Sequence, residues 1–444
     1  MNRSRKLAYS LGNLAASLTY NAFFTYVNFF YVDTLKLPAC LFALGFTLYT
    51  LWNAINDPLA GALSDRTRTR WGRRVPYIAL GSLPLAVFFA LVWLAPFRGN
   101  DPRLFAYFLL IIFLYDGFYT FVTLNLVALF PEMYPSLDER AEVSGYRQVF
   151  GLVGLVLGIA LPPILYGSFG WEAMGLIFGV VSAGCLYVSL WGSRERPAFQ
   201  QDEPLRLKAA LLGTLANRSF DSFVASYMLV QYAFSLIMAA IPFYAKYVLR
   251  LPEQNTSFLL LATILVAFPM LYVWGRAAIR WGTRAAMLGS MGVLAAALLP
   301  FLVVRDFRTA LLATSAVGLG LGGLILLTDV LLADIVDEDE LKTGVRREGM
   351  YFGMSGFLGR LSGVLQTQTI NGILLYTGYN ARLAVDAQPP AVLDGLRALV
   401  SLIPMVALGL GTVALLFYPL HGSRLARVKA EMAAVHARKG ARPV

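Results

Sequence analysis

The chain has 444 residues, of which 58% are hydrophobic and only 14% are charged. Soluble domains carry about 25% charged residues, so this composition excludes an ordinary soluble domain and indicates a membrane protein. With two cysteines and two histidines, both histidines in the C-terminal tail, the chain lacks the residues for a disulfide scaffold, a four-cysteine zinc site or a histidine relay within the membrane.

Twelve apolar segments are long enough to cross a bilayer, which takes about 20 residues each. In chain order they lie at 7–33, 40–63, 76–96, 104–131, 146–167, 171–192, 221–248, 256–278, 284–303, 307–333, 349–377 and 393–420. The predicted fold is therefore all-α, a polytopic membrane protein with twelve transmembrane helices. An even number of spans places both termini on the same side of the membrane.

Lysine and arginine indicate which side that is. Most of the 37 basic residues lie in the termini and in alternate loops, at 64–75, 132–147, 193–220, 276–284 and 334–347. The positive-inside rule then places both termini on the cytoplasmic side of the membrane. The expected location is the cell inner membrane. This bias also accounts for the net charge of +11 without a nucleic-acid partner.

The two halves of the chain resemble one another. "RWGRRVPYIALGSLPLA" begins at Arg70 and "RWGTRAAMLGSMGVLA" at Arg280, while "DERAEVSGYRQVFG" begins at Asp138 and "TGVRREGMYFGMSG" at Thr343. Two pseudo-symmetric six-helix halves are typical of secondary transporters. The expected parts are an N-terminal bundle at 1–192, a cytoplasmic linker at 193–220, a C-terminal bundle at 221–420 and a basic cytoplasmic tail at 421–444.

One glycine-rich stretch needs an interpretation. "GLGLGG" at 318–323 resembles a phosphate-binding loop, but it lies in an apolar segment and no Lys-Ser or Lys-Thr pair follows it. Close packing of helices explains it better. No Walker motif or nucleophile motif is present, so neither ATP hydrolysis nor another enzyme activity is expected.

Asp57 is an acid inside the second apolar segment, one helical turn after Asn53. Charge within a span is unfavourable and usually functional. A carboxylate with amide and hydroxyl oxygens can hold Na⁺, and a lone desolvated carboxyl can instead carry a proton. The alternative is a structural acid that pairs with an arginine of the following loop.

Asp116 is a second acid inside an apolar segment, in "LYDGFYTFVTLN". Tyr119, Thr120 and Thr123 follow on the same helical stripe. These side chains can exchange hydrogen bonds with a hydroxylated ligand. The alternative is an interhelical hydrogen bond, which such residues often provide in membranes.

Arg360 lies deep in the eleventh segment and needs a counter-ion, for which Asp57 and Asp116 are the candidates. Substrate or cation binding would compete for that carboxylate and make the pair a switch. A fixed structural pair, or an arginine that reaches the cytoplasmic side, is the alternative. Lys246, close to the outer end of the seventh segment, is interpreted as reaching the membrane surface.

Charged clusters occupy two equivalent cytoplasmic loops, and opposed charges there can close an inner gate. The expected gate residues are Arg140, Glu142, Asp334, Asp337, Glu340 and Arg347. Exposed ion pairs contribute only about 0–1 kcal/mol each, which suits a gate that opens in every cycle. A solvated charged loop is the alternative.

Four motifs carry a family resemblance. They are "LWNAINDPLAGALSDRTRTRWGRRVPYI", "YDGFYTF", "PEMYPSLDERAEVSGYRQVFG" and "LLADIVDEDELKTGVRREGMYFG". In this order they resemble the signatures of the melibiose-permease-like glycoside–pentoside–hexuronide:cation symporter family. The resemblance covers nearly the whole chain. It implies the major facilitator fold and alternating access.

The resemblance also implies roles for individual residues. Asp57 matches the second acid of the family's D-A-x-N-D-P cation motif, whereas Asn53, Ser17 and Thr123 stand where the family has further acids. Tyr119 and Thr120 match the motif on the fourth helix, Arg147 matches the arginine after the 4–5 loop, and Arg360 replaces a lysine. The implied cation-coupling set is Asp57, Asn53, Ser17 and Thr123. The implied substrate-binding set is Asp116, Tyr119, Thr120, Arg147 and Arg360.

A cation site with one acid is a poorer Na⁺ site than one with two or three, since fewer charges offset dehydration of the ion. The coupling ion is therefore expected to be H⁺ or Na⁺, with no other metal and no cofactor, and uncoupled transport stays open. The leading expectation is cation-coupled symport of a sugar or glycoside by a monomer in the lipid bilayer. The alternative is a lysophospholipid or amphiphile carrier of the same fold. A membrane enzyme or a non-transporting sensor is a third, disfavoured interpretation.

Overall fold

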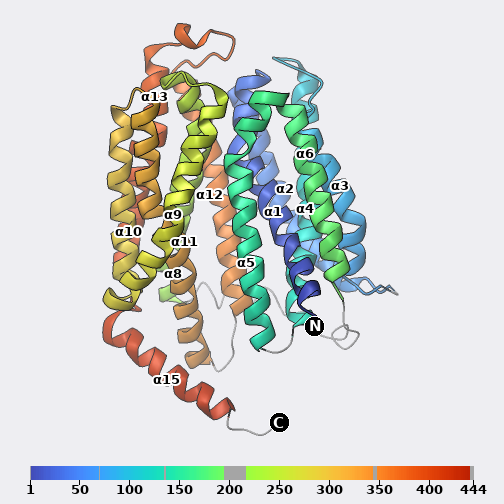
Figure 1. Cartoon of the computed structure of the whole chain (residues 1–444), viewed down its shortest axis with the longest axis vertical. Coiled ribbons are helices and arrows are strands. Elements are labelled where there is room, and N and C mark those ends of the chain that lie inside the picture. The colour runs from blue at the N-terminus through green and yellow to red at the C-terminus, as the bar shows by residue number, and fades with distance from the viewer. Residues whose placement is uncertain (1, 70, 135–136, 195–216, 344–347, 441–444) are drawn as a thin grey trace. The chain divides into compact units, whose positions relative to one another are not determined.

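A computed structural model describes residues 2–69, 71–134, 137–194, 217–343 and 348–440. Within these ranges the elements are helices, joined by loops and one isolated bridge between Thr69 and Gly72. Figure 1 shows long helices running roughly along the same direction within each part of the chain. The prediction of an all-α polytopic membrane protein is confirmed.

The first half of the chain follows the predicted spans closely. Its helices are α1 (Arg3–Asn28) with the π-helical turn η1 (Phe29–Thr34), α2 (Ala39–Arg66), α3 (Val75–Trp93), α4 (Pro102–Met133), α5 (Leu137–Ala160) and α6 (Pro162–Gly192). The fifth and sixth spans, predicted at 146–167 and 171–192, are divided by the turn at Gly170, so this boundary is confirmed. α5 ends before two prolines, which lack backbone N–H groups, and the chain turns inside α6 at Gly170, whose φ is 86°.

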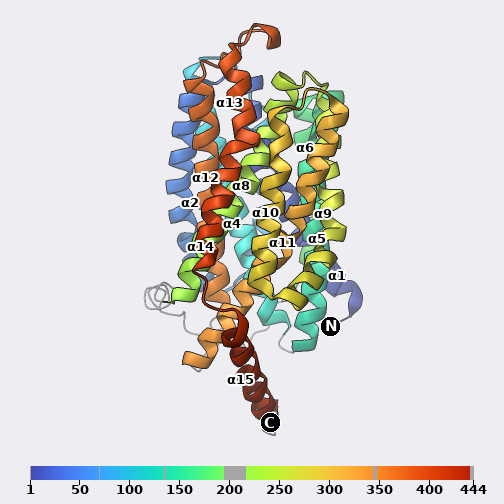
Figure 2. The same ribbon diagram turned by 90° about the vertical axis from the view of Figure 1, so that its left-hand side faces the viewer.

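The second half repeats this plan, but a 3₁₀ turn ends one of its helices and its last span consists of two helices. Its elements are α8 (Arg218–Phe243), η3 (Tyr244–Val248), α9 (Glu253–Trp281), α10 (Thr283–Leu298), η4 (Leu299–Leu302), α11 (Phe307–Thr343), α12 (Glu348–Tyr376), η5 (Val385–Ala387), α13 (Pro390–Val400), α14 (Leu402–Leu416) and α15 (Gly422–Gly440). Figure 2 shows α14 continuing the course of α13, so these two helices form the twelfth span. α15 leaves the end of α14 at an angle and extends beyond it (Figures 1 and 2).

Nine described helices are long and apolar enough to cross a membrane. Of the remaining long helices, α1 and α12 carry more polar residues, and α2 contains the apolar piece Ala39–Asn53 within its described side chains. These three helices contain Ser17, Asn53 and Arg360, which the sequence assigns to the transport site. Polar residues in a span are tolerated where they line a cavity or face the bundle interior.

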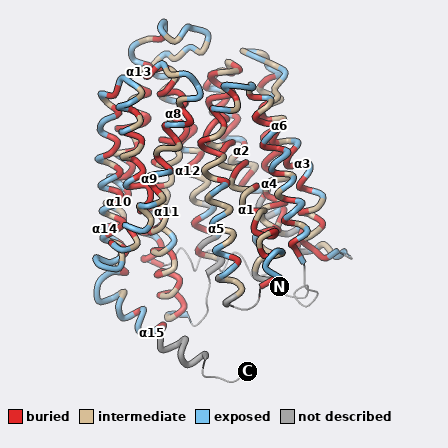
Figure 3. The backbone as a smooth tube through the Cα atoms, viewed as in Figure 1, coloured by how far each residue is buried: buried red, intermediate tan, exposed pale blue. Residues whose placement is uncertain are grey.

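Large apolar side chains are exposed along the helices, as expected for a surface that faces lipid. Leu80 is 71% exposed, Val180 72% and Ile279 85%. Figure 3 shows exposed residues along most helices and not only in the loops. Soluble monomers rarely expose apolar surface on this scale.

The chain divides into two compact units. Unit 1 consists of Met1–Pro204, Ile241–Leu261 and Thr367–Leu393, and unit 2 of Leu205–Ala240, Ala262–Gln366 and Asp394–Val444. Two segments from the second half of the sequence thus cluster with the first half. The expected six-helix halves at 1–192 and 221–420 stay a prediction.

The glycine-rich stretch of α11 packs tightly against neighbouring helices of unit 2, as the sequence predicts. A Cβ atom added to Gly318 would overlap the carbonyl oxygen of Thr263 on α9, and one added to Gly320 would lie 2.6 Å from the backbone nitrogen of Leu294 on α10. Backbone atoms cannot move aside as side chains do. Gly318 therefore allows the close approach of α9 and α11.

Gly318→Ala should destabilise the protein by about 1–3 kcal/mol, because the added methyl group forces the two helices apart. The measurement is the melting temperature of the purified protein in detergent. Gly292→Ala on α10 is the matched control, since a Cβ there meets no described atom within 4 Å. Equal melting temperatures for the two variants would contradict the packing argument.

Candidate transport site

α1 lies at the centre of unit 1 because its neighbours cover most of its faces. A Cβ added to Gly154 of α5 would lie 2.5 Å from the carbonyl oxygen of Leu14, and one added to Gly158 would lie 2.6 Å from that of Leu18. The α1 and α5 backbones are therefore in direct contact. Small residues at helix interfaces allow this in membranes.

Other helices cover further faces of α1. The ring of Phe23 lies 6.3 Å from that of Phe46 on α2 and 5.0 Å from that of Tyr115 on α4. The Ser189 hydroxyl of α6 donates a hydrogen bond to the carbonyl oxygen of Tyr9 at 2.8 Å. α2, α4, α5 and α6 thus all contact α1, and only part of its surface stays exposed.

Part of the exposed surface of α1 carries polar and aromatic side chains at helical spacing. Asn13, Ser17, Tyr20 and Phe24 follow one another at intervals of three or four residues and are all partly exposed. We call these four residues the α1 stripe. Its hydroxyl, amide and aromatic groups differ from the apolar side chains that α3 and α10 expose, so the stripe is suited to water or a polar ligand rather than lipid.

Tyr119 of α4 reaches the α1 stripe. Its ring lies 6.0 Å from that of Tyr20, and its hydroxyl donates to the carbonyl oxygen of Ala16 at 3.4 Å. The Thr123 hydroxyl donates to the carbonyl oxygen of Tyr119 at 2.7 Å. The structure thus brings two residues expected on α4 close to the stripe.

Ser17 forms a local cluster on α1. The Asn21 side-chain nitrogen donates to the Ser17 carbonyl oxygen at 2.7 Å and to its hydroxyl oxygen at 3.2 Å. Both side chains are partly exposed. Ser17, expected in the cation-coupling set, and Tyr119, expected in the substrate-binding set, therefore lie at the same level of unit 1.

Asp116 is held by a row of donors on α2. Its carboxylate accepts hydrogen bonds from the Tyr49 hydroxyl at 2.9 Å, the Asn53 amide at 3.0 and 3.1 Å and the Asn56 amide at 3.1 Å. These donors lie one turn apart on one face of α2, and Asp116 is 3% exposed. Thr120, one turn further along α4, is 2% exposed. Asn53 and Asp116, which the sequence assigns to separate sets, form one hydrogen-bonded cluster.

Two residues with expected roles cannot be placed in this network. The Asp57 side chain lies outside the described residues, although its backbone directly follows Asn56 in α2. Arg360 is partly exposed on α12 in unit 2. The expected pairing of Arg360 with Asp57 or Asp116 stays a prediction.

Arg147 of α5 lies beside the first turns of α1. Its Nε atom donates to the Asn13 side-chain oxygen at 3.2 Å, and its guanidinium lies 4.6 Å from the ring centroid of Phe130 and 5.9 Å from that of Tyr9. Cation–π contacts of this kind hold an arginine in a defined position. Arg147 is thereby fixed at the stripe's N-terminal end.

Two of the expected gate residues, Arg140 and Glu142, lie at the end of unit 1 where α1 begins. Glu142 accepts a hydrogen bond from the Lys6 ammonium at 2.7 Å, and Glu139 lies 3.4 Å from the same nitrogen. The Arg140 Nε atom donates to the carbonyl oxygen of Tyr134 at 2.6 Å. Sequence analysis missed Lys6, although it lies in the basic N-terminal run.

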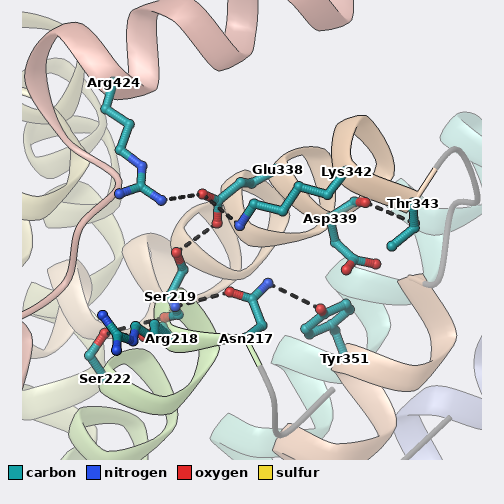
Figure 4. Close-up of polar contacts among 10 residues, drawn as sticks. All are labelled: Asn217, Arg218, Ser219, Ser222, Glu338, Asp339, Lys342, Thr343, Tyr351 and Arg424. Atoms are coloured by element: carbon teal, nitrogen blue, oxygen red, sulfur yellow. Dashed lines mark hydrogen bonds and ion pairs between the residues drawn. The ribbon is translucent and has the colours of Figure 1, made fainter. Parts of the chain in front are cut away.

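The corresponding acids of unit 2 belong to the last turns of α11, where Figure 4 shows Glu338 and its partners. Glu338 is buried, and its carboxylate accepts from the Ser219 hydroxyl at 2.6 Å and from Arg424 at 2.7 Å, with the Lys342 nitrogen at 3.0 Å. Arg424 belongs to α15. The helix formed by the basic tail is thus bound to α11 by a buried carboxylate that sequence analysis missed.

Asp334 makes a similar contact with α15, through the Lys429 nitrogen at 3.3 Å. Asp337 is partly exposed and Glu340 is 4% exposed. Arg347 lies outside the described residues. The gate assignments of these residues stay predictions.

The opposite end of unit 1 holds a cluster that the sequence analysis did not predict. Asp33 of η1 has a fully buried side chain. Its carboxylate accepts hydrogen bonds from the Lys246 ammonium at 2.5 Å, the Tyr379 hydroxyl at 2.6 Å and the Tyr247 hydroxyl. Lys246 therefore does not simply reach the membrane surface, because its ammonium pairs with this buried acid.

A local repeat lies behind this cluster. "TLKLP" at 34–38 and "VLRLP" at 248–252 follow the π-helical turns η1 and η3. Lys36 and Arg250 occupy the same position in the two copies, with φ values of 65° and 55°, which non-glycine residues rarely adopt. The two copies therefore have the same backbone turn. Asp33, just before the first copy, forms an ion pair with Lys246, just before the second.

Known proteins resemble this chain over almost its full length. The family described as MFS/sugar transport protein matches residues 8–422. The uncharacterized symporter sll1374 of Synechocystis sp. is 27% identical, covering 94% of each chain. The isoprimeverose transporter of Lactiplantibacillus pentosus is 26% identical, covering 94% of this chain and 88% of its own length.

A solved structure matches at the level of the fold. It is a bacterial homolog of the human lysosomal transporter Spinster, in an inward-facing and unoccupied conformation, with a TM-score of 0.67 at 16% identity, covering 97% of this chain and 99% of its own. The major facilitator fold expected from the four motifs is therefore confirmed. The chain is a multi-pass membrane protein of the MFS/sugar transport family and, within it, a secondary active transporter of the glycoside–pentoside–hexuronide:cation symporter group rather than an enzyme.

Proposed function

We propose that this transporter takes up a sugar or glycoside together with H⁺ or Na⁺ across the cell inner membrane. The observation that carries the proposal is the α1 stripe with Tyr119 beside it. Tyrosine and phenylalanine rings offer flat faces to the C–H groups of a sugar, and serine and asparagine side chains exchange hydrogen bonds with its hydroxyls. A partly exposed polar stripe inside an apolar unit favours such a ligand.

The residues take two groups of roles in this proposal. The cation-coupling residues are Asp57, Asn53, Ser17 and Thr123. The substrate-binding residues are Asp116, Tyr119, Thr120, Arg147 and Arg360. Among them Asp57 is the acid that holds the ion or proton, because it matches the family's cation motif.

Asp116 has a linking role in this scheme. Its carboxylate binds the amide nitrogens of Asn53 and Asn56, and Tyr119 lies one turn further along the same helix. A cation bound near Asp57 would move these amides, and Asp116 would transmit the movement to α4. Coupling requires that ion and substrate bias the same element, and α4 is that element here.

The proposed topology places both termini in the cytoplasm, so the Asp33 cluster closes the extracellular end of unit 1. The proposed cytoplasmic gate consists of Arg140, Glu142, Asp334, Asp337, Glu340 and Arg347. The transporter works as a monomer, and nucleic acid is not a partner. Its alternative substrate class is a lysophospholipid or another amphiphile.

The first test is thermal stabilisation of the purified protein by a panel of glycosides and lysophospholipids. Each compound is tested with Na⁺, with Li⁺ and across pH, because a bound ligand raises apparent stability by mass action. A shift with glycosides that needs Na⁺ identifies the sodium ion, and one that follows pH and ignores Na⁺ identifies the proton. A shift with lysophospholipids alone would replace the sugar proposal with the alternative.

A further inference from the structure

Asn28, the last residue of α1, carries an unpaired buried amide. It is 1% exposed, and neither its side-chain nitrogen nor its side-chain oxygen has a hydrogen-bond partner among the described residues. Leaving both a donor and an acceptor desolvated and unpaired is unfavourable, and such groups in native proteins need an explanation. A ligand that is present in only part of the transport cycle supplies one.

Its position continues the α1 stripe. Asn28 lies four residues after Phe24 and eight after Tyr20, so it falls on the same helical face. The stripe residues from Asn13 to Phe24 are partly exposed, whereas Asn28 is buried. Asn28 therefore lies at the closed end of a face that is accessible further down.

The neighbouring groups already have their partners. The Asp33 carboxylate, five residues on, is occupied by Lys246, Tyr247 and Tyr379. One helical turn away lie Phe24, Thr25, Tyr31 and Val32, of which Tyr31 already donates to the carbonyl oxygen of Val92 at 3.0 Å. Asn28 thus lies among mostly aromatic and aliphatic side chains, at the level just below the extracellular cluster.

We infer that Asn28 is a specificity-determining residue that hydrogen-bonds one or two hydroxyl groups of the transported sugar. This inference rests on the proposed sugar substrate. An amide presents one acceptor and two donors in a plane, which matches a pair of neighbouring hydroxyls. A site built to pair with a hydroxyl strongly rejects an analogue that lacks it.

The test uses the full-length purified protein and isoprimeverose, with analogues that each lack one hydroxyl. Asn28→Leu is similar in volume and removes both unpaired groups. It should leave the melting temperature without sugar unchanged or higher, since a buried unpaired amide is replaced by an apolar group. Isoprimeverose affinity should fall by about tenfold to a hundredfold, the usual effect of losing hydrogen bonds to a ligand.

The analogues separate direct contact from an indirect effect. In the unsubstituted protein, at least one deoxy analogue should bind about tenfold more weakly than isoprimeverose. In Asn28→Leu, that analogue and isoprimeverose should bind equally. Asn217→Leu is the control, because this buried amide is paired on both sides: it donates to the Tyr351 hydroxyl and accepts from the Ser219 backbone, so the variant should lose stability without changing the selectivity.

Two results would overturn the assignment of Asn28 while leaving the proposed function intact. One is a loss of melting temperature in Asn28→Leu as large as that in Asn217→Leu, with unchanged affinity. The other is an analogue preference in Asn28→Leu that equals that of the unsubstituted protein. If the unsubstituted protein binds neither isoprimeverose nor any other glycoside, the sugar proposal itself fails, and the assignment of Asn28 fails with it.

Discussion

Asp33→Asn should open the end of unit 1 that we propose to be extracellular, and should reduce uptake strongly. The substitution keeps the size of the side chain but leaves the Lys246 ammonium without its buried counter-charge and weakens the acceptor for Tyr379. Removing one partner of a buried ion pair costs about 3–5 kcal/mol. Because the Lys246 side chain is 31% exposed, we expect about 2 kcal/mol here, or roughly a thirtyfold shift of the conformational equilibrium.

The shift can be measured with Phe24→Cys on the α1 stripe, in a background from which Cys40 and Cys185 have been removed. A membrane-impermeant thiol reagent added outside should label this position roughly thirtyfold faster when Asp33→Asn is also present. Lys246→Met should act in the same direction, and the two substitutions together should be less disruptive than the sum of the single ones.

The Arg250–Asp386 ion pair provides a matched control near the same end of unit 1. Its nitrogen and oxygen are 2.8 Å apart, but the two side chains are 62% and 74% exposed. Exposed pairs contribute about 0–1 kcal/mol, so Asp386→Asn should leave labelling and uptake unchanged. If Asp33→Asn behaves like Asp386→Asn, the buried cluster does not hold this end of unit 1 closed.

The spans could be predicted because hydropathy depends on the bilayer, which imposes a length and an apolar composition on every helix. Where a helix breaks is less visible. Within the predicted fifth span, the end of α5 before Pro162 and Pro163 was not predicted, because these residues lie in an apolar stretch that looks continuous. The twelfth span likewise gives no composition signal for its break at Ser401.

Residues of the candidate site could be predicted where a polar side chain interrupts an apolar span. Asn53 and Asp116 stand out as polar residues in apolar spans, and each lies in the cluster that the structure shows. Tyr49 and Asn56 were missed, although they lie on the same face of α2 as Asn53. Their role depends on which face of α2 meets α4, and the sequence of one helix does not contain that information.

Contacts between distant segments escaped prediction for the same reason. Asp33 and Lys246 are 213 residues apart, and neither has an obvious partner nearby. The repeated "LKLP" and "LRLP" endings were a usable signal, because equivalent turns in two related halves can come together. The basic tail was judged by its charge alone, whereas Arg424 and Lys429 use that charge to bind α15 to the acids of α11.

The role of Asp57 leads to the other large expected effect. Asp57→Asn should abolish cation-driven accumulation of the substrate, because an amide of the same shape can neither carry a proton nor neutralise a bound Na⁺. The other proposed cation-coupling residues, Asn53, Ser17 and Thr123, are neutral. The measurement is uptake into proteoliposomes under an imposed Na⁺ or pH gradient.

The fold should survive this substitution, so passive exchange of substrate across the membrane and the melting temperature should stay close to those of the unsubstituted protein. Asp101→Asn is the matched control. Asp101 caps the first turn of α4 outside the spans by accepting from the Arg103 backbone, and asparagine serves equally well at such a position. Normal gradient-driven accumulation in Asp57→Asn would show that the coupling charge lies elsewhere, and the buried carboxylate of Asp116 would then be the next acid to test.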